Sequence, residues 1–377
     1  MNQRQRLQTL GELAVLVASV CGCALFLGKL IPQAVGWDFP QYFLAVRLPV
    51  WTRHNYDEFL HNAHALLTPV GVSYVPPYVR PAIFSLPLWT IMWLPYWTAF
   101  QVWAGIQGIA YVVTVWLLKR RLHFIPPLLV GMGIFIPATH GIVNGQDAAT
   151  VALLCVIGFL LLERGRGTLA GLAFGLCMYK FHLFGLLPLF LILRKQRQAL
   201  WSFLVTGIVV AVVSLCLQSP SEYLDMVVRS PKLGLGFSIR SIVGLRGVAA
   251  TLQMPALYWM SAAVIAGATI YAIPRLPFDR AFCAMLLGSL LCAYHVTWYD
   301  YSIAVFPLLF LLSSPGWTGR SVSFVMLFYP AIWFGNRVVV MCSFILLAWM
   351  VLIWPVVGQV ALARPTPDAA EAANSAA

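Results

Sequence analysis

Long apolar runs separated by short polar turns make up most of the chain. The first run covers residues 10–35, and later runs cover residues 81–95, 97–118, 124–142, 147–162, 168–193, 199–217, 255–273, 278–296, 300–313, 321–335 and 338–362. A helix of about 20 apolar residues crosses the hydrocarbon core of a bilayer. The pattern therefore predicts an all-α polytopic membrane protein with about 11–12 transmembrane helices, built as a single membrane domain over residues 1–364.

Two segments depart from this pattern. Residues 36–80 form the longest polar stretch before the C-terminal tail and carry acidic, basic and histidine side chains. We expect them to form a long first extracytoplasmic loop, with helices that lie on the membrane surface. Residues 365–377 are rich in alanine, and we expect them to form a disordered cytoplasmic tail.

Composition narrows the class of protein further. Of the 377 residues, 61% are hydrophobic and only 10% are charged, whereas about a quarter of the residues in a soluble domain are charged. The net charge of +12 fits loops that face anionic membrane lipids, and the chain has no basic–aromatic motif that would indicate a nucleic-acid partner. All eight cysteines lie inside apolar runs, so they predict buried thiols rather than a disulfide framework or a metal site.

The basic residues indicate how the chain is threaded through the membrane. With the N-terminus in the cytoplasm, fourteen lysines and arginines fall on the inner side and eight on the outer side, as the positive-inside rule requires. The parity of the spans then makes residues 168–193 two short helices that meet near Lys180, and residues 81–95 a partial insertion. Broken helices at membrane depth usually line a cavity. The threading predicts a multi-pass protein of the cell inner (plasma) membrane.

The same threading collects ionisable side chains at the extracytoplasmic face. The acids and bases placed there are Asp38, Asp147, Glu222, Asp225, Asp300, His54, His61, His64, His295, Arg80, Arg240 and Lys180. The inner side keeps short basic turns and little else. Acids, histidines and cations near one membrane face, under a long loop, indicate chemistry on a lipid-borne substrate.

Residue chemistry alone leaves the roles of these groups open. Asp38 ends the first apolar run, where it is either a general base or the cap of the next helix. Lys180 is either a phosphate contact or a lysine that snorkels to the interface. Arg240 is either a second phosphate contact or a water-facing arginine. His295 belongs either to a site or to an aromatic belt at the membrane surface.

Six short motifs occur in an order that resembles the polytopic glycosyltransferases of family 87, which have the GT-C superfold. They are Asp38-Phe39 with Tyr42; Tyr74, Pro76, Pro77 and Pro87; Asn144-Gly145-Gln146; Ala170-Gly171-Leu172 with Lys180; Ser238 with Arg240; and His295 with Trp298 and Tyr299. The similarity covers roughly residues 10–310. Two positions depart from the family pattern: Phe181 follows Lys180, where proline is common, and the motif around Arg240 is loose.

The resemblance implies a GT-C-like fold and a reaction outside the cytoplasmic leaflet. In that reaction, an inverting glycosyltransferase moves a mannose-like hexose or a pentose from a polyprenyl monophosphate donor to a lipid or glycan acceptor. The transition state of such a transfer resembles an oxocarbenium ion. The reaction requires no metal and no other cofactor, since cationic side chains can neutralise a monophosphate.

The resemblance also assigns roles to eight side chains. A base must take the proton of the acceptor hydroxyl, and cations must hold the departing lipid phosphate. The assigned residues are Asp38 as the general base; Lys180, Arg240 and His295 as donor phosphate contacts; and Tyr42, Gln146, Trp298 and Tyr299 as substrate-positioning residues.

A secondary transporter or lipid flippase is the main alternative function. Broken helices and charges at membrane depth also occur in such proteins. The chain shows no internal repeat, and its polar groups gather at one face, whereas a transporter needs gates at both faces. A membrane acyltransferase with His295 as its base and a structural membrane protein are further alternatives.

Overall fold

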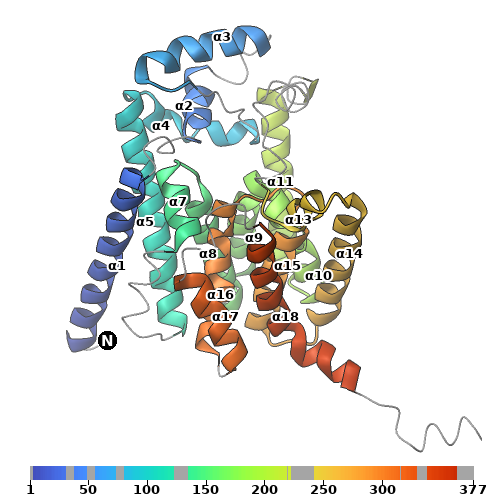
Figure 1. Cartoon of the computed structure of the whole chain (residues 1–377). Coiled ribbons are helices and arrows are strands. Elements are labelled where there is room, and N and C mark those ends of the chain that lie inside the picture. The colour runs from blue at the N-terminus through green and yellow to red at the C-terminus, as the bar shows by residue number, and fades with distance from the viewer. Residues whose placement is uncertain are drawn as a thin grey trace, which may run out of the picture.

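The computed structural model describes residues 3–30, 38–48, 56–73, 80–122, 135–218, 220–221, 242–314, 316–328 and 338–362. Every regular element in these ranges is a helix, and none of them contains a strand (Figure 1). The predicted all-α class is therefore confirmed.

The described helices are given in chain order, and η marks a 3₁₀ helix. The first are α1 (Gln3–Leu30), α2 (Pro40–Arg47), α3 (Tyr56–Leu67), η2 (Thr68–Val70), η3 (Ala82–Ser85), α4 (Trp89–Met92), α5 (Tyr96–Leu122), α7 (Ile136–Val143) and α8 (Ala148–Glu163). The next are α9 (Gly167–Leu176), η4 (Cys177–Leu183), α10 (Leu187–Leu193), α11 (Arg197–Leu217), α13 (Leu245–Thr251) and α14 (Pro255–Ala272). The last are α15 (Phe278–Cys292), η6 (Trp298–Ala304), α16 (Val305–Ser313), α17 (Trp317–Phe328) and α18 (Val338–Leu362).

Four of the described helices are long and apolar enough to cross a membrane. They contain the segments Tyr96–Lys119 in α5, Arg197–Leu217 in α11, Pro255–Ala272 in α14 and Val338–Val357 in α18. Large apolar side chains point outward from these helices; Ile208 is 62% exposed and Val264 is 69% exposed. Such surfaces suit lipid rather than water, so the helices indicate a polytopic membrane protein. The total of 11–12 spans and the single domain over residues 1–364 stay predictions.

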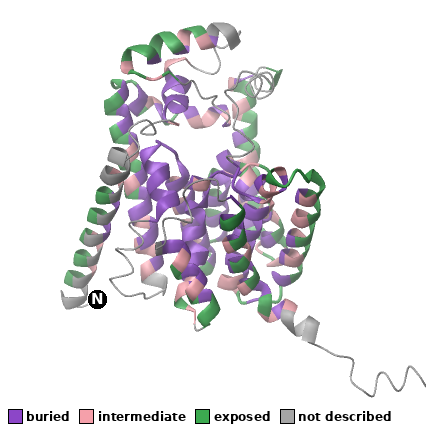
Figure 2. Ribbon diagram, viewed as in Figure 1, coloured by how far each residue is buried: buried purple, intermediate pink, exposed green. Residues whose placement is uncertain are grey.

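Two hydrophobic cores hold the described helices together. The larger core lies inside the bundle of α7, α8, α9, α10, α15, α16 and α18, where the buried residues of Figure 2 concentrate. The smaller core joins α2, α3 and α4 to the first half of α5 through aromatic side chains that include Phe39, Tyr42 and Trp103. We call this second group of helices the cap. Figure 1 shows α3 lying across the top of the molecule, and the N-terminus of α1 and the C-terminal end of α18 at the opposite end.

The broken hairpin predicted over residues 168–193 is confirmed. Helix α9 gives way to the 3₁₀ turn η4, and the backbone leaves helical geometry at Lys180, with φ −121° and ψ 48°. Before this break, α9 packs closely against α11, because a Cβ atom at Gly171 would collide with the carbonyl oxygen of Ala199. Close approach through small residues is a common way to pack helices in membranes. Residues 81–95, the predicted partial insertion, form only the short helices η3 and α4.

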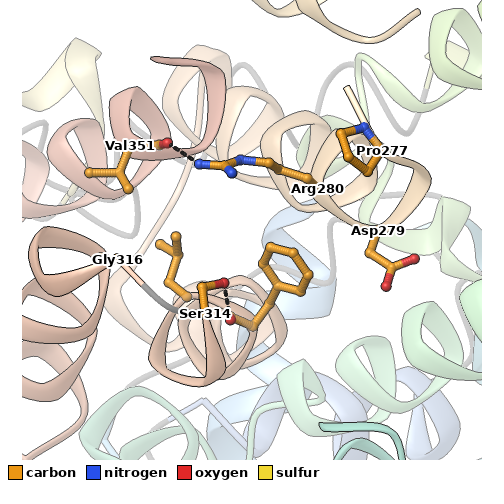
Figure 3. A pocket seen from close by; sticks show the side chains of 9 residues that line it. Pro277, Asp279, Arg280, Ser314, Gly316 and Val351 are labelled. Atoms are coloured by element: carbon orange, nitrogen blue, oxygen red, sulfur yellow. Dashed lines mark hydrogen bonds between the residues drawn. The ribbon is translucent and has the colours of Figure 1, made fainter. Parts of the chain in front are cut away.

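A pocket of about 500 Å³ lies at the N-terminal end of α15 (Figure 3). Arg280 lines this pocket, and its guanidinium donates to the carbonyl oxygens of Val351 at 2.7 Å and Leu352 at 2.8 Å. Pro355 lies inside α18 and has no N–H to give to Val351, the residue four positions earlier. Arg280 therefore supplies the hydrogen bond that the proline removes, which is a structural role.

Candidate active site

The start of α2 is fixed against the turn between α7 and α8. The backbone N–H of Asp38 donates to the carbonyl oxygen of Asn144 at 3.0 Å. Gly145 has φ +77°, and a Cβ atom there would lie 2.7 Å from the Cβ atom of Phe39. The Asn-Gly turn therefore brings the cap and the bundle together at this point, since other residues would be strained and would clash.

Two buried cations and two buried aspartates are joined by three ion pairs. We call this group of Arg80, Asp147, Lys180 and Asp300 the ion-pair network. Arg80 binds Asp147 through two hydrogen bonds, from Nε to Oδ2 at 2.7 Å and from Nη2 to Oδ1 at 3.1 Å. The Nζ atom of Lys180 lies 2.9 Å from Oδ1 of Asp147 and 2.7 Å from Oδ1 of Asp300. All four side chains are buried. Each cation is therefore neutralised by a carboxylate inside the protein.

Neighbouring polar groups complete the ion-pair network. The backbone N–H and the hydroxyl of Thr297 donate to Oδ2 of Asp300, at 2.9 and 2.8 Å. Arg80 also donates to Oε1 of Gln41 at 2.6 Å and to Oε1 of Gln146 at 3.1 Å. Buried charges need such partners to offset their desolvation, and this arrangement supplies them.

Asp38 lies beside the network but is not part of it. Its side chain is partly exposed, and no cation among the described residues forms an ion pair with it. Burial raises the pKa of Asp38 to about 6, although a hydrogen bond from Gln146 and the charges of Arg80 and Lys180 oppose the increase. Burial acts in the same direction on Asp147, but there Arg80 and Lys180 outweigh it and hold the pKa well below the usual range.

The alternative role of Asp38 as a helix cap has no support in this geometry. The N-cap position of α2 is Phe39, and no side chain caps the helix. The Asp38 carboxylate is therefore not engaged in starting α2.

The four predicted substrate-positioning residues lie near Asp38 and the ion-pair network. The Tyr42 hydroxyl lies 3.4 Å from Oε1 of Gln146. The Tyr299 ring lies 5.4 Å from Nζ of Lys180, and the Trp298 ring lies 4.0 Å from the ring of His140.

The predicted phosphate contacts are placed differently from one another. Lys180 is inside the ion-pair network, with two of its three N–H donors directed at carboxylates. His295 follows α15, and its ring lies 6.0 Å from the ring of His182. The structure thus brings Asp38, Lys180 and His295 to one end of the bundle. Arg240 lies outside the described residues, as do Ser238, Tyr74, Pro76, Pro77, Glu222, Asp225 and His54.

Sequence reasoning placed Arg80, Asp147 and Asp300 at this face but did not predict that they pair with one another or with Lys180. The available signal was the scarcity of charge, because only 10% of the chain is charged and a charge at membrane depth needs a partner. Sequence reasoning assigned no role to Gln41, His140 or His182.

His61 and His64 are exposed on α3, away from this cluster. The described residues contain no group of three or more His, Cys, Asp or Glu side chains arranged to hold a metal ion.

Comparison with known proteins bears on this site directly. The model of Glycosyltransferase family 87 matches residues 78–299, which is more than half of the chain. The matched segment contains Arg80, Asp147, Lys180 and His295, and Asp38 precedes it. The chain matches none of the curated proteins and none of the solved structures with which it was compared.

Proposed function

Because the chain belongs to glycosyltransferase family 87, and is therefore a sugar transferase of class EC 2.4, we propose that it uses a polyprenyl monophosphate sugar as donor. The transferred sugar is a mannose-like hexose or a pentose, and the acceptor is a lipid or a glycan. The reaction takes place at the extracytoplasmic face of the plasma membrane. The gathering of acids, histidines and cations at the end of the bundle that carries the cap supports this assignment.

The contrast between Asp38 and the two paired aspartates carries the proposal. A general base works best when its pKa lies near the working pH. Asp38 meets this condition, since it is partly exposed, has no ion-pair partner among the described residues, and has a pKa of about 6. Asp147 and Asp300 do not, because Arg80 and Lys180 hold their carboxylates.

The proposed step inverts the anomeric carbon. The Asp38 carboxylate takes the proton of the acceptor hydroxyl, and the hydroxyl oxygen forms a bond to the anomeric carbon on the face opposite the phosphate. The bond between that carbon and the phosphate oxygen breaks at the same time. The polyprenyl phosphate leaves with the electron pair, so cations near the phosphate stabilise the transition state.

Lys180, Arg240 and His295 are the proposed contacts of this phosphate. Lys180 keeps one N–H donor beyond the two directed at Asp147 and Asp300. Tyr42, Gln146, Trp298 and Tyr299 are proposed to position the sugar. Aromatic rings and amide groups suit this task, because a sugar has both apolar C–H faces and hydroxyl groups. The reaction as proposed uses no metal or other cofactor.

A secondary transporter or flippase would use the same broken hairpin differently. Its polar groups would line a path between both faces. Family membership favours sugar transfer instead, as does the position of the ion-pair network at the start of α8, next to the cap.

Asp38→Asn tests the proposal, because asparagine keeps the shape of aspartate and cannot accept the proton. We expect sugar transfer by the purified protein, supplied with a polyprenyl phosphate sugar and a crude lipid acceptor pool, to fall by about 10²–10⁴-fold. Asp279→Asn, in the first turn of α15 at the far end of that helix, is the matched control and should keep full activity. Near wild-type turnover by a folded Asp38→Asn variant would remove Asp38 as the base.

A further inference from the structure

We propose that His182 and His295 together form an anion site that takes the phosphate group of a polyprenyl phosphate, and that imidazole protonation accompanies binding. This inference rests on the proposed function and assigns a role to His182, which the reaction above does not use. It names a two-histidine site at the point where the broken hairpin meets the loop after α15.

The ion-pair network has no net positive charge of its own to offer to an anion. Arg80 and Lys180 are each bound by aspartates, so the four charges of the network sum to zero. Asp38 adds a further negative charge when it is deprotonated. An incoming phosphate anion would therefore meet an environment without net positive charge among these five groups. Two imidazoles at the edge of the network can supply that charge by taking up protons.

The geometry of the two histidines suits one shared anion. Their ring centroids lie 6.0 Å apart with planes at 66°, and both side chains are only partly buried. An imidazole N–H reaches an oxygen acceptor at about 2.8 Å, so a single phosphate lies within reach of both rings. His182 is two residues after Lys180 in the turn η4, and the charge of Lys180 acts on both imidazoles.

Each histidine is preceded by an exposed aromatic side chain that would face the lipid part of such a ligand. Phe181 is 54% exposed and Tyr294 is 52% exposed. The Tyr294 ring stacks on Trp259, at a centroid distance of 6.3 Å, and Trp259 is itself 64% exposed. A phosphate at the histidines would therefore sit beside an aromatic surface, where the guanidinium of Arg246 lies 3.5 Å from the centroid of the Tyr294 ring. This arrangement fits an anion that carries a prenyl chain better than a free phosphate.

The charges around the pair set the direction of its protonation. Burial lowers the pKa of His295; Arg246, Lys180 and Arg80 lower it further, and Asp300 acts in the opposite direction. Burial lowers the pKa of His182 to about 4; Asp300 opposes this shift, and Lys180, His295 and Arg80 add to it. A bound phosphate would favour the protonated form of both rings. During transfer the phosphate gains charge as its bond to the sugar breaks, so an imidazolium there would also stabilise the leaving group.

The test uses the detergent-purified full chain and farnesyl methyl phosphate, a diester that keeps one negative charge across the experiment. Binding is measured by calorimetry between pH 5.5 and pH 8 in two buffers with different ionisation enthalpies. We expect affinity to rise as pH falls, with net proton uptake, and farnesol to bind without this dependence. A wild-type affinity that does not change with pH, with no proton uptake, would overturn the proposal without requiring any variant.

His182→Gln is the variant that isolates the new residue. Glutamine keeps a hydrogen-bond donor but cannot take up a proton, so we expect affinity at pH 6 to fall about 10-fold and the pH dependence to weaken. His64→Gln, on the exposed surface of α3, is the matched control and should bind like wild type. A folded His182→Gln protein with wild-type affinity and wild-type pH dependence would remove His182 from the site.

Sugar transfer by the wild-type protein is measured separately to keep the two proposals apart. Wild-type protein that transfers sugar, together with His182→Gln protein that binds the diester normally, would overturn the anion site and leave the proposed function standing. Wild-type protein that binds the diester with proton uptake but transfers no sugar would support the anion site and overturn the function.

Discussion

The turns before α2 and before α8 each carry an aspartate, and the two aspartates have opposite electrostatic surroundings. Asp38 lies two residues before α2, and Asp147 lies directly before α8. A hydrogen bond from the Asp38 N–H to the Asn144 carbonyl oxygen joins the two turns. Asp147 receives two cations, whereas Asp38 receives none among the described residues. The consequence is a low pKa for Asp147 and a pKa of about 6 for Asp38.

The difference between the two turns comes from distant parts of the chain. Arg80 enters from the segment before η3, and Lys180 enters from the break in the hairpin. Both cations contact Asp147. Asp147 thus stabilises the folded protein through its ion pairs, whereas Asp38 keeps a carboxylate that can accept a proton.

The largest effect is expected from Asp147→Asn. This change removes the charge that pairs with both Arg80 and Lys180, and breaking a buried ion pair on one side costs about 3–5 kcal/mol. We expect a large loss of folded protein, measured by size-exclusion chromatography and thermal unfolding in detergent, with sugar transfer lost in proportion.

A second variant shows whether the loss comes from an unpaired Arg80. In Arg80→Gln/Asp147→Asn, both members of the pair are neutral, while Lys180 keeps Asp300. We expect the double variant to be more stable than Asp147→Asn alone. Equal or lower stability would mean that Asp147 acts through something other than this ion pair.

The sequence predicts the helices of this protein better than it predicts their contacts. The apolar run at 338–362 coincides with α18, and the parity of the charged turns correctly predicts the break at Lys180. Both features depend on local apolarity and on charge counted along the chain. The partners of Lys180 depend on tertiary structure, because Asp300 is 120 residues away, and no local pattern specifies such a pair. For the same reason the sequence could not tell which of Asp38, Asp147 and Asp300 would have no ion-pair partner among the described residues.

Asp38→Asn is expected to change stability in the direction opposite to Asp147→Asn. The pKa of Asp38 is raised on folding, so the native state binds this proton more tightly and loses stability as pH rises from about 4 to about 6. Removing the carboxylate removes that loss, and we expect a gain of about 1–3 kcal/mol at pH 7.5. The gain should become small near pH 4, where Asp38 is protonated in the native state and about half protonated in the unfolded state. Thermal unfolding at the two pH values measures it, and destabilisation at pH 7.5 would contradict the elevated pKa.

The rate of sugar transfer is expected to report the same pKa. A base must be deprotonated to act, so at saturating donor the kcat/KM for the acceptor should be flat above pH 7 and fall about tenfold per pH unit below about pH 6. The measurement is the pH profile of transfer, with protein integrity checked at each pH. At saturating donor, a rate that stays constant down to pH 4.5 would indicate a carboxylate with the ordinary aspartate pKa and would remove the contrast with Asp147.

The smallest effect is expected at Gln146, which contacts both Arg80 and Asp38. Its side chain accepts a hydrogen bond from Arg80 and gives one to the Asp38 carboxylate. The second bond favours the charged form and lowers the pKa of Asp38. In Gln146→Met, which keeps similar volume, we therefore expect the acid limb of the pH profile to move to higher pH by less than about one unit.

Gln41→Met is the control for the contact with Arg80. Gln41 also accepts a hydrogen bond from Arg80, but it donates to the backbone carbonyl of Asp38 rather than to the carboxylate. Its pH profile should keep the wild-type midpoint, even if the maximal rate falls. An equal shift in both variants would assign the effect to Arg80 instead of to the Gln146 hydrogen bond. A lower rate in Gln146→Met at every pH, with an unchanged midpoint, would mean that Gln146 positions the sugar and does not tune the base.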